Sequence, residues 1–459
     1  MKEQLKFIKG KLGYGVGAIG LDLSYGMFYT YLSYYLSSVL NLPEAFLLIL
    51  TPIARIWDGI NDPMMGTIVD NTKTKLGKYR PWILIGALSN AVVLSLLFTS
   101  FGMSGMKLYI YISVMYVLWG MTNTMADIPY WSMVPSFTND PKERNMIATV
   151  ARTFSGLGQG IISIGTPMVL PLLSETVVNG EKVYDARGFS LWAIICACAL
   201  VGFSSLSVAL TKEKHITSSK EKFTFKKMFS IAKNNDQLLV FMLFAMLSNA
   251  GWYMVSGVGV YYFDVVAGDP AKQSAFNTFG AIGSVLGLLV IPVMTKFTSR
   301  RRTYQFSLLL AIFGFVAMAL SVKIFNSYLL MNIFYVLASV GIASMFVAQT
   351  VFLADIVDYG EVKQGFRSES ITFSMKGFLQ KMAYTIQTII LFAGLDISKY
   401  NENLHAQNSE AVKGAIDFMM LTAPVILLVL SFIIFTARFK LHGEYMDKIN
   451  AALKKGNEE

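Results

Sequence analysis

Long apolar segments separated by short polar connections run along the whole chain. Three of them, at residues 82–98, 191–210 and 418–435, are close in length to the ~20 residues with which an α-helix crosses a bilayer. Extending this pattern, we predict twelve membrane-spanning helices, at residues 14–39, 43–69, 82–101, 107–135, 147–173, 188–211, 237–263, 274–296, 304–322, 327–357, 369–395 and 412–437. The sequence therefore predicts an all-α integral membrane protein.

Composition supports this class and excludes others. Of the 459 residues, 54% are hydrophobic and 15% are charged, whereas soluble domains carry about 25% charged residues. The net charge of +10 does not indicate nucleic-acid binding, because the basic residues lie in the connections, where they orient the chain in the membrane. We therefore expect contact with membrane lipid, and neither nucleic acid nor an obligate protein partner.

The distribution of Lys and Arg also predicts the orientation of the chain. An even number of spans places both termini on one side, and the connections and termini of that side carry 28 Lys and Arg residues against 7 on the other. Positive residues are retained in the cytoplasm. We expect a multi-pass protein of a bacterial plasma (inner) membrane with both termini in the cytoplasm.

One long basic connection divides the predicted helices into two sets of six. The sequence predicts an N-terminal six-helix bundle at 1–211, a cytoplasmic middle loop at 212–236, a C-terminal six-helix bundle at 237–437 and a cytoplasmic tail at 438–459. Similar charged loops follow the second and eighth spans, but such loops are common in the cytoplasm and leave duplication of the halves open. Six-helix repeats around a central cavity are typical of secondary transporters.

Charged residues lie inside predicted spans of the first half. They are Asp22, Arg55, Asp58, Asp62, Asp127 and Arg152. A charge in hydrocarbon is costly, so each of these residues needs a partner or a water-filled cavity. Because Arg55, Asp58 and Asp62 stand at i, i+3 and i+7, they share one helix face.

That face is a candidate cation site. Asp58 and Asp62, with the amide of Asn61, offer hard oxygen ligands that suit Na⁺ or Li⁺. Without a metal, two close carboxylates cannot both stay ionised, so the pair can instead carry a proton. In the alternative interpretation Arg55 neutralises Asp58 in a static ion pair, which leaves Asp62 without a role.

A second set of residues suggests a sugar site. Thr124, Asp127 and Trp131 again stand at i, i+3 and i+7. The carboxylates of Asp22 and Asp127 can accept hydrogen bonds from sugar hydroxyls, Arg152 can donate a planar fork, and an indole can cover the apolar face of a pyranose. Alternatively, Trp131 belongs to the aromatic belt at the membrane interface.

The second half contributes fewer charged residues within its spans. Lys381 lies in mid-span and is predicted to face the acidic first half, whereas Lys376 lies closer to the cytoplasm, where it can snorkel. Asp355 and Asp358, with Lys363 and Arg367, are predicted to form a cytoplasmic gate of ion pairs.

Four segments resemble one transporter family. They are RIWDGINDPMMGTIVDNTKTKLGKYRPW (55–82), YGVGAIGLD (14–22), ADIPYWSMVP (126–135) and ADIVDYGEVKQGFRSESI (354–371). Taken in their order along the chain, these segments resemble the glycoside–pentoside–hexuronide:cation symporters, the melibiose permease-like branch of the major facilitator superfamily. The resemblance implies the major facilitator fold and a secondary transporter that carries a sugar with Na⁺, Li⁺ or H⁺ by alternating access, without another cofactor.

The resemblance also implies site residues. The implied cation site, a metal site for Na⁺ or Li⁺, consists of Asp58, Asn61, Asp62 and Thr124, and the implied sugar site consists of Asp22, Asp127, Trp131, Arg152 and Lys381. The chain departs from the melibiose permease-like pattern at Leu21, Asn123, Phe346, Lys376 and Gly377. Because Leu21 replaces a Lys beside Asp22, we expect a neutral glycoside, such as a disaccharide or small oligosaccharide, and poor transport of hexuronides.

Three alternative functions are a lipid carrier, a membrane enzyme and a sugar sensor. A lipid or lysolipid carrier of the same fold should have an apolar cavity, against which the charged residues argue. A membrane enzyme is disfavoured, because the three histidines (His215, His405 and His442) lie in or beside loops and no nucleophile–base pair is evident. A sugar sensor with a transporter fold stays open.

Overall fold

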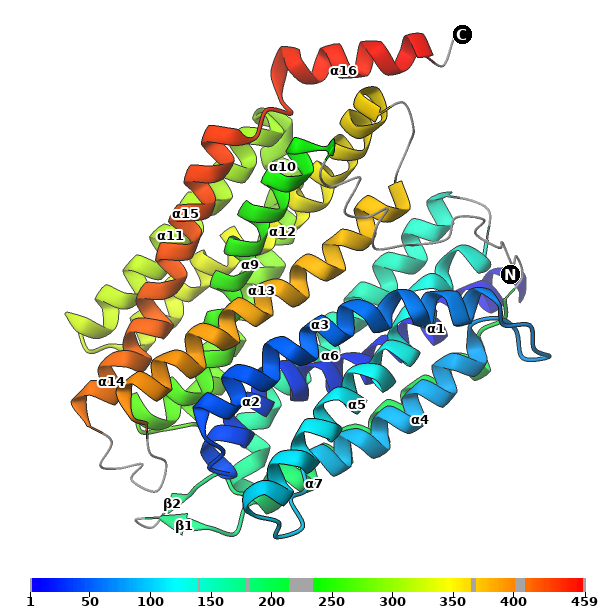
Figure 1. The fold of residues 1–459 in the computed structure, drawn as a ribbon. Helices are drawn as coiled ribbons and strands as arrows, with labels where there is room; N and C mark the ends of the chain where they lie inside the picture. The colour runs from blue at the N-terminus through cyan, green and yellow to red at the C-terminus, as the bar shows by residue number, and fades with distance from the viewer. Residues whose placement is uncertain are drawn as a thin grey trace. The chain divides into compact units, whose positions relative to one another are not determined.

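The structure, a computed structural model, describes residues 2–138, 141–178, 181–213, 234–364, 369–400 and 409–456. These residues are almost entirely helical and form two compact units (Figure 1). Unit 1 contains the helices from α1 to α7, and unit 2 contains those from α9 to α16. Each unit is described by itself.

Unit 1 contains six long helical stretches and one short hairpin. Its elements are α1 (Lys2–Gly26), the π-helical η1 (Met27–Tyr31), α2 (Leu32–Tyr34), η2 (Tyr35–Val39), α3 (Glu44–Asp70), α4 (Arg80–Leu97), α5 (Gly105–Ser132), η3 (Val134–Ser136), α6 (Pro141–Leu173), β1 (Val177–Val178), β2 (Glu181–Lys182) and α7 (Ala186–Leu210). The strands β1 and β2 pair antiparallel, with Val177 opposite Lys182. Because α1 runs without a break through η1, α2 and η2, it forms the first helical stretch.

Small residues bring the first helix of unit 1 close to the last. A Cβ added at Gly17 would lie 2.8 Å from Ser207 of α7, and one added at Gly20 would lie 2.9 Å from Leu200. Small residues at such spacing let two membrane helices approach to backbone contact, where dispersion forces hold them together. This contact fixes the position of α1, and of the polar residues that it carries, relative to α7.

Unit 2 repeats the six stretches and adds a terminal helix. Its elements are α9 (Asp236–Tyr261), η4 (Tyr262–Val266), α10 (Lys272–Phe297), α11 (Arg300–Lys323), α12 (Tyr328–Gln364), α13 (Glu369–Ser398), α14 (Glu410–Asp417), η6 (Phe418–Thr422), α15 (Ala423–Arg438) and α16 (Gly443–Gly456). At the link to α16, Arg301 of α11 contacts the ring of His442 and donates a 2.6 Å hydrogen bond to the carbonyl of Thr436.

The same pairs of helices pack in both units. In unit 1, α1 packs on α6 and α7, α3 on α5, and α4 on α5 and α7. In unit 2, α9 packs on α13 and α15, α10 on α12, and α11 on α12 and α15. Since the order along the chain is also the same, the two units have one packing scheme, which supports the duplication that the loop pattern left open.

Most described helices follow the predicted spans to within a few residues at their ends, but α1 begins twelve residues before its predicted start at 14 and α12 ends seven residues after its predicted end at 357. Within the described residues, nine helical segments are long and apolar enough to cross a membrane. The predicted spans at 14–39, 43–69 and 107–135 are also helical but are not among those nine, because polar residues interrupt them. The count of twelve crossings stays a prediction, and the three polar helices are the ones that carry most of the candidate site.

Candidate functional site

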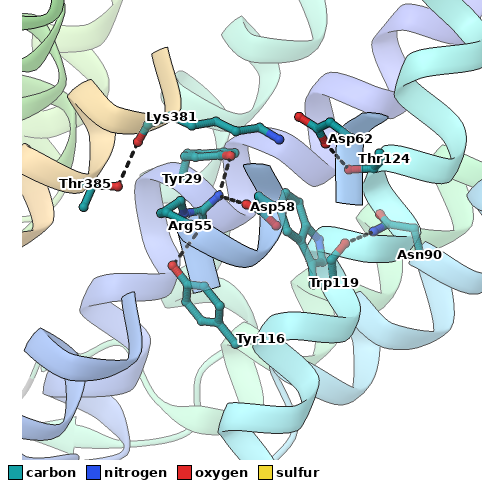
Figure 2. Close-up of polar contacts among 10 residues, drawn as sticks. All are labelled: Tyr29, Arg55, Asp58, Asp62, Asn90, Tyr116, Trp119, Thr124, Lys381 and Thr385. Carbon is teal, nitrogen blue, oxygen red and sulfur yellow. Dashed lines mark hydrogen bonds and ion pairs between the residues drawn. The ribbon is translucent and has the colours of Figure 1, made fainter. Parts of the chain in front are cut away.

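Arg55 of α3 is the most enclosed charged residue of the candidate site. Its side chain is 1% exposed, and Nη1 donates to Asp58 Oδ2 at 2.6 Å and to the hydroxyl of Tyr29 at 2.8 Å (Figure 2). Nη2 donates to the hydroxyl of Tyr116 at 3.0 Å. The guanidinium carbon lies 5.0–5.5 Å from the ring centroids of Phe28, Tyr29 and Tyr116. The ion pair that the sequence offered as an alternative is therefore present in this conformation.

Asp62, one turn further along α3, has a different partner. Its Oδ1 accepts a 2.9 Å hydrogen bond from the hydroxyl of Thr124 on α5 (Figure 2). Asn61 is 8% exposed, and its Nδ2 has no hydrogen-bond partner among the described residues. A Cβ added at Gly120 of α5 would overlap Asp58 Oδ1, so this glycine allows α5 to lie against the acidic face of α3.

The four predicted cation ligands thus lie on two facing helices but do not form one closed cluster. Asp62 and Thr124 are in contact, Asn61 precedes Asp62, and Asp58 is occupied by Arg55. In the described part of the chain, no three His, Cys, Asp or Glu side chains converge as a metal centre of those ligands would require. A cation held here would depend on mixed oxygen donors, of which the carboxylate of Asp62 and the hydroxyl of Thr124 are in place.

Three of the predicted sugar residues are brought together at the end of α5. The indole Nε1 of Trp131 donates to Asp127 Oδ1 at 2.9 Å. The guanidinium carbon of Arg152, on α6, lies 3.8 Å from the centroid of the Trp131 ring. The carboxylate of Asp127, the indole of Trp131 and the guanidinium of Arg152 thus lie next to one another, with the indole N–H directed to the carboxylate. We call these three groups the Asp127 layer.

Asp22 lies at the contact of α1 with α6. The hydroxyl of Ser155, one turn along α6 from Arg152, forms a hydrogen bond with the Asp22 carboxylate, and the charges of Asp127 and Arg152 act on it. A Cβ added at Gly158 would lie 3.0 Å from Asp22 Cβ, so this glycine permits the close approach of the two helices. Asp22 is therefore close enough to the Asp127 layer to interact electrostatically with Asp127 and Arg152.

A tyrosine clasp that the sequence interpretation missed supports this layer. The hydroxyl of Tyr14 donates to the carbonyl of Tyr130 at 2.5 Å, and the hydroxyl of Tyr130 donates to the carbonyl of Tyr14 at 2.6 Å. Their rings stack with centroids 4.4 Å apart, and both side chains are fully buried. Because Tyr130 precedes Trp131, the clasp fixes the end of α5 against α1.

The hydroxyl partners of Arg55 were also missed, although a signal for them exists. Tyr29 stands seven residues after Asp22, and Tyr116 stands eight before Thr124, so each shares a helix face with a predicted site residue. Tyrosine is common in membrane helices, which makes this spacing informative only when the partner helix is known.

In unit 2 the predicted residues lie on α12 and α13. The backbone carbonyl of Lys381 accepts a 2.9 Å hydrogen bond from Thr385 (Figure 2). Lys376 Nζ donates to the hydroxyl of Thr350 on α12 at 2.7 Å. Instead of only snorkelling, as was expected, Lys376 thus has a partner on a neighbouring helix.

The predicted gate is described only in part. Asp355 forms a 2.7 Å ion pair with Arg300 at the start of α11. Asp358 lies one turn further along α12, and Arg367 lies outside the described residues. Lys363, also predicted for the gate, forms an ion pair with Asp236 of α9, a partner that the sequence did not indicate.

These features define a class of protein. Two units with the same helix packing are built from long apolar helices, and one of them holds a buried ion pair on α3, which packs against α5. Apolar helices of this length are typical of membrane proteins. Secondary transporters are built from repeats of this kind, with binding sites between their helices. The fold and the site define a secondary transporter of the major facilitator type.

Comparison with known proteins supports the fold and identifies the family. The crystal structure of the nucleoside transporter NupG matches with a TM-score of 0.66 and 12% identity, over 94% of this chain and 100% of that one, which shows the fold. The profile of the MFS/sugar transport protein family matches residues 13–443. The chain belongs to this family, and it is a transporter and not an enzyme.

Characterised relatives are similar over nearly the whole chain. A lactose permease of Lactobacillus helveticus is 28% identical over 96% of this chain and 72% of its own. A raffinose carrier protein of Pediococcus pentosaceus is 28% identical over 99% and 72%. An isoprimeverose transporter of Lactiplantibacillus pentosus is 29% identical over 91% and 85%. These matches confirm the resemblance to the glycoside–pentoside–hexuronide:cation symporters.

Proposed function

We propose that this protein is a sugar:cation symporter of a bacterial inner membrane that works by alternating access with both termini in the cytoplasm. The observation that carries the proposal is the layer of Asp127, Trp131 and Arg152, with Asp22 beside it. Its relatives are named for lactose, raffinose and isoprimeverose, which are all sugars.

The layer has the groups that sugar recognition requires. Asp127 accepts from Trp131 through one oxygen, Oδ1, and a carboxylate has further lone pairs for sugar hydroxyls. Arg152 is exposed and has several N–H donors, while Trp131 and the half-buried Asp22 are partly accessible. A sugar that binds here would exchange hydrogen bonds with these groups without leaving a buried charge unpaired.

The cation part of the proposal rests on α3. Asp62 supplies a carboxylate oxygen and Thr124 a hydroxyl oxygen, and Asp58 supplies a third oxygen ligand when Arg55 releases it. Since Arg55 is itself a fixed cation, it compensates Asp58 when no ion is bound, and Na⁺, Li⁺ or H⁺ would compete with it. The ion pair is then one state of the coupling site, and the role of Asp62 is explained.

The substrate class follows from the charges around Asp22. Asp22 and Asp127 supply two carboxyl groups, Arg152 and the Lys381 of the implied sugar site supply two basic groups, and Leu21 adds none, so the site lacks a further cation that would favour an anionic sugar. In a low-dielectric cavity an anionic uronic acid meets repulsion, whereas a neutral glycoside gains two strong acceptors. In a competition assay, lactose and related neutral glycosides should displace bound sugar better than glucuronides, and the reverse order would contradict this substrate class.

Uptake into sealed vesicles tests the proposed function. Radiolabelled lactose, raffinose and isoprimeverose would be supplied with an inward gradient of Na⁺, Li⁺ or H⁺, or with no gradient. Accumulation above the external concentration only with one of the cation gradients is expected. Binding without uptake would instead identify a sensor, and uptake of lysolipid without sugar would identify a lipid carrier.

A further inference from the structure

A closed network of polar groups lies behind the ion pair of α3. The hydroxyl of Ser24 (α1) donates to Asn90 Oδ1 (α4) at 2.6 Å, and Trp119 Nε1 (α5) donates to Ser24 Oγ at 3.2 Å (Figure 2 shows Asn90 and Trp119). Asn90 Nδ2 donates to Thr122 Oγ1 at 3.0 Å and to the carbonyl of Trp119 at 3.3 Å. Ser24, Asn90 and Trp119 are at most 1% exposed. Each polar group has its partner, so the network fixes the orientation of the Trp119 indole.

The ring of Phe28 lies between Trp119 and Arg55 and contacts both. The indole stacks on Phe28, with centroids 3.5 Å apart and planes 8° from parallel. Phe28 is fully buried, and its ring lies 5.1 Å from the guanidinium carbon of Arg55. Phe28 also meets the ring of Tyr116, a hydroxyl partner of Arg55, edge-on at 4.8 Å. The Arg55 guanidinium therefore packs against Phe28, Phe28 stacks on Trp119, and Trp119 is hydrogen-bonded to Asn90 and Ser24.

Unit 2 contains a network of the same kind without the ion pair. Gln349 Nε2 (α12) donates to Ser248 Oγ (α9) at 3.1 Å and to Tyr304 OH (α11) at 3.4 Å. These helices correspond in the packing scheme to α5, α1 and α4. The Tyr304 ring is bordered by the aromatic rings of Phe244 and Phe352. This network is a natural control for the one in unit 1.

We propose that Ser24, Asn90 and Trp119 are positioning residues that hold Arg55 on Asp58 and thereby set the affinity of the site for the coupling cation. This inference rests on the proposed function, in which the cation competes with Arg55. A network that holds the guanidinium firmly makes Arg55 a strong competitor. Loosening the network frees Asp58 for part of the time, so a cation should bind at lower concentration.

The test measures cation binding without a sugar. The purified full-length protein is titrated with NaCl, and in parallel with LiCl, at constant ionic strength, and the thermal unfolding midpoint is followed at each concentration. A ligand that binds only the folded state raises this midpoint, so the titration yields a half-saturating concentration. Asn90→Leu removes the hydrogen bonds of Asn90 to Ser24, Thr122 and Trp119, whereas Trp119→Phe removes the indole N–H and part of the ring area but keeps an aromatic ring on Phe28.

Two controls separate positioning from a general loss of stability. Gln349→Leu breaks the corresponding network of unit 2. Trp192→Phe removes an equivalent 2.9 Å hydrogen bond, from a buried indole to the hydroxyl of Thr166, elsewhere in unit 1. All four variants are expected to unfold at a lower temperature, because each removes at least one buried hydrogen bond.

Only the two network variants of unit 1 should change the response to the cation. Their half-saturating concentration is expected to fall about fivefold, which corresponds to ~1 kcal/mol. An unchanged or raised concentration in both, or an equal fall in the controls, would overturn the inference while leaving symport intact. A wild-type protein that responds to neither Na⁺ nor Li⁺ would also overturn this inference. If its uptake shows no dependence on a proton gradient either, the proposed coupling itself is overturned.

Discussion

The two units share their helix packing but not their charge. In unit 1, the second helical stretch, α3, presents Arg55, Asp58 and Asp62 to the facing α5. In unit 2, the corresponding α10 presents glycines to α12: a Cβ added at Gly283 would overlap the carbonyl of Val336, and one at Gly287 would lie 2.6 Å from that of Val340. The same helix pair is thus a charged contact in one unit and a close backbone contact in the other.

This difference shows what each unit is suited to do. Burying Arg55 and Asp58 costs desolvation energy, which the ion pair, the tyrosine hydroxyls and three aromatic rings offset. Such an arrangement can change when a cation arrives. The α10–α12 contact depends on shape complementarity and has no comparable alternative partner among the described residues, so it is suited to hold its helices in one arrangement.

Ion pairs in unit 2 lie at the ends of helices. Arg300–Asp355 joins the start of α11 to α12, and Lys323–Asp417 joins the end of α11 to α14 at 3.0 Å. Their basic members are 60% and 52% exposed, against 1% for Arg55. Exposed pairs contribute little to stability because water screens them. Of these described pairs, the one with both members enclosed is therefore Arg55–Asp58 of unit 1, and three predictions test how the two units differ.

The largest effect is expected from Asp62→Asn. The amide keeps the size of the side chain and an acceptor for Thr124, but it removes the negative charge that attracts a cation. Cation-driven accumulation of sugar should be abolished, while exchange of sugar across the membrane remains measurable in the same vesicles. Asp417→Asn, at the exposed pair of unit 2, is the matched control and should accumulate sugar normally. Normal accumulation by Asp62→Asn would refute the assignment.

Asp127→Ala should reduce sugar affinity strongly. The change leaves the Trp131 N–H without its acceptor and removes a negative charge from the layer that holds Arg152. Asp127 and Trp131 are partly buried, and a bound sugar would shield them further, so losing one partner of this charge network is expected to cost ~3 kcal/mol, which lowers affinity by about a hundredfold. The matched variant is Thr350→Ala, which takes an uncharged acceptor from Lys376 in unit 2 and should change affinity by less than about tenfold. Equilibrium binding of labelled lactose measures both, and near-normal affinity in Asp127→Ala would show that Asp127 is structural.

The smallest effect is a pH response at the junction of α15 and α16. Burial, and then the charge of Arg301, lower the pKa of His442 from its usual value near 6.5. The neutral ring is thus the form that fits the fold, so its contribution to stability is complete above pH ~6.5 and is lost as the pH falls through the lowered pKa. Thermal unfolding should show a slight drop in midpoint on acidification that His442→Gln reduces. An identical pH profile in the two proteins would contradict this role.

Much of the fold could be predicted from the sequence because it depends on local properties. The length of an apolar segment decides whether a helix can cross a bilayer, and most of the described helices follow the predicted spans closely. Helical periodicity likewise predicts that Arg55, Asp58 and Asp62 share one face, and it places Asp127 on one face with Trp131. The sugar-transport family could be recognised from short motifs for the same reason, since each motif lies within a few helical turns.

The pairing of groups on different helices was decided by the tertiary structure alone. The sequence offered the Arg55–Asp58 pair as an alternative, because the two residues are one helical turn apart. The partner of Asp62 instead depends on the rotation and height of α5, which brings Thr124 to it, and Gly120 lets α5 approach Asp58. The network of Ser24, Asn90 and Trp119 joins residues up to 95 positions apart. A hydrogen bond needs its atoms within about 3 Å. Periodicity along one helix determines direction but not the distance to another helix, so only the packed structure could identify these partners.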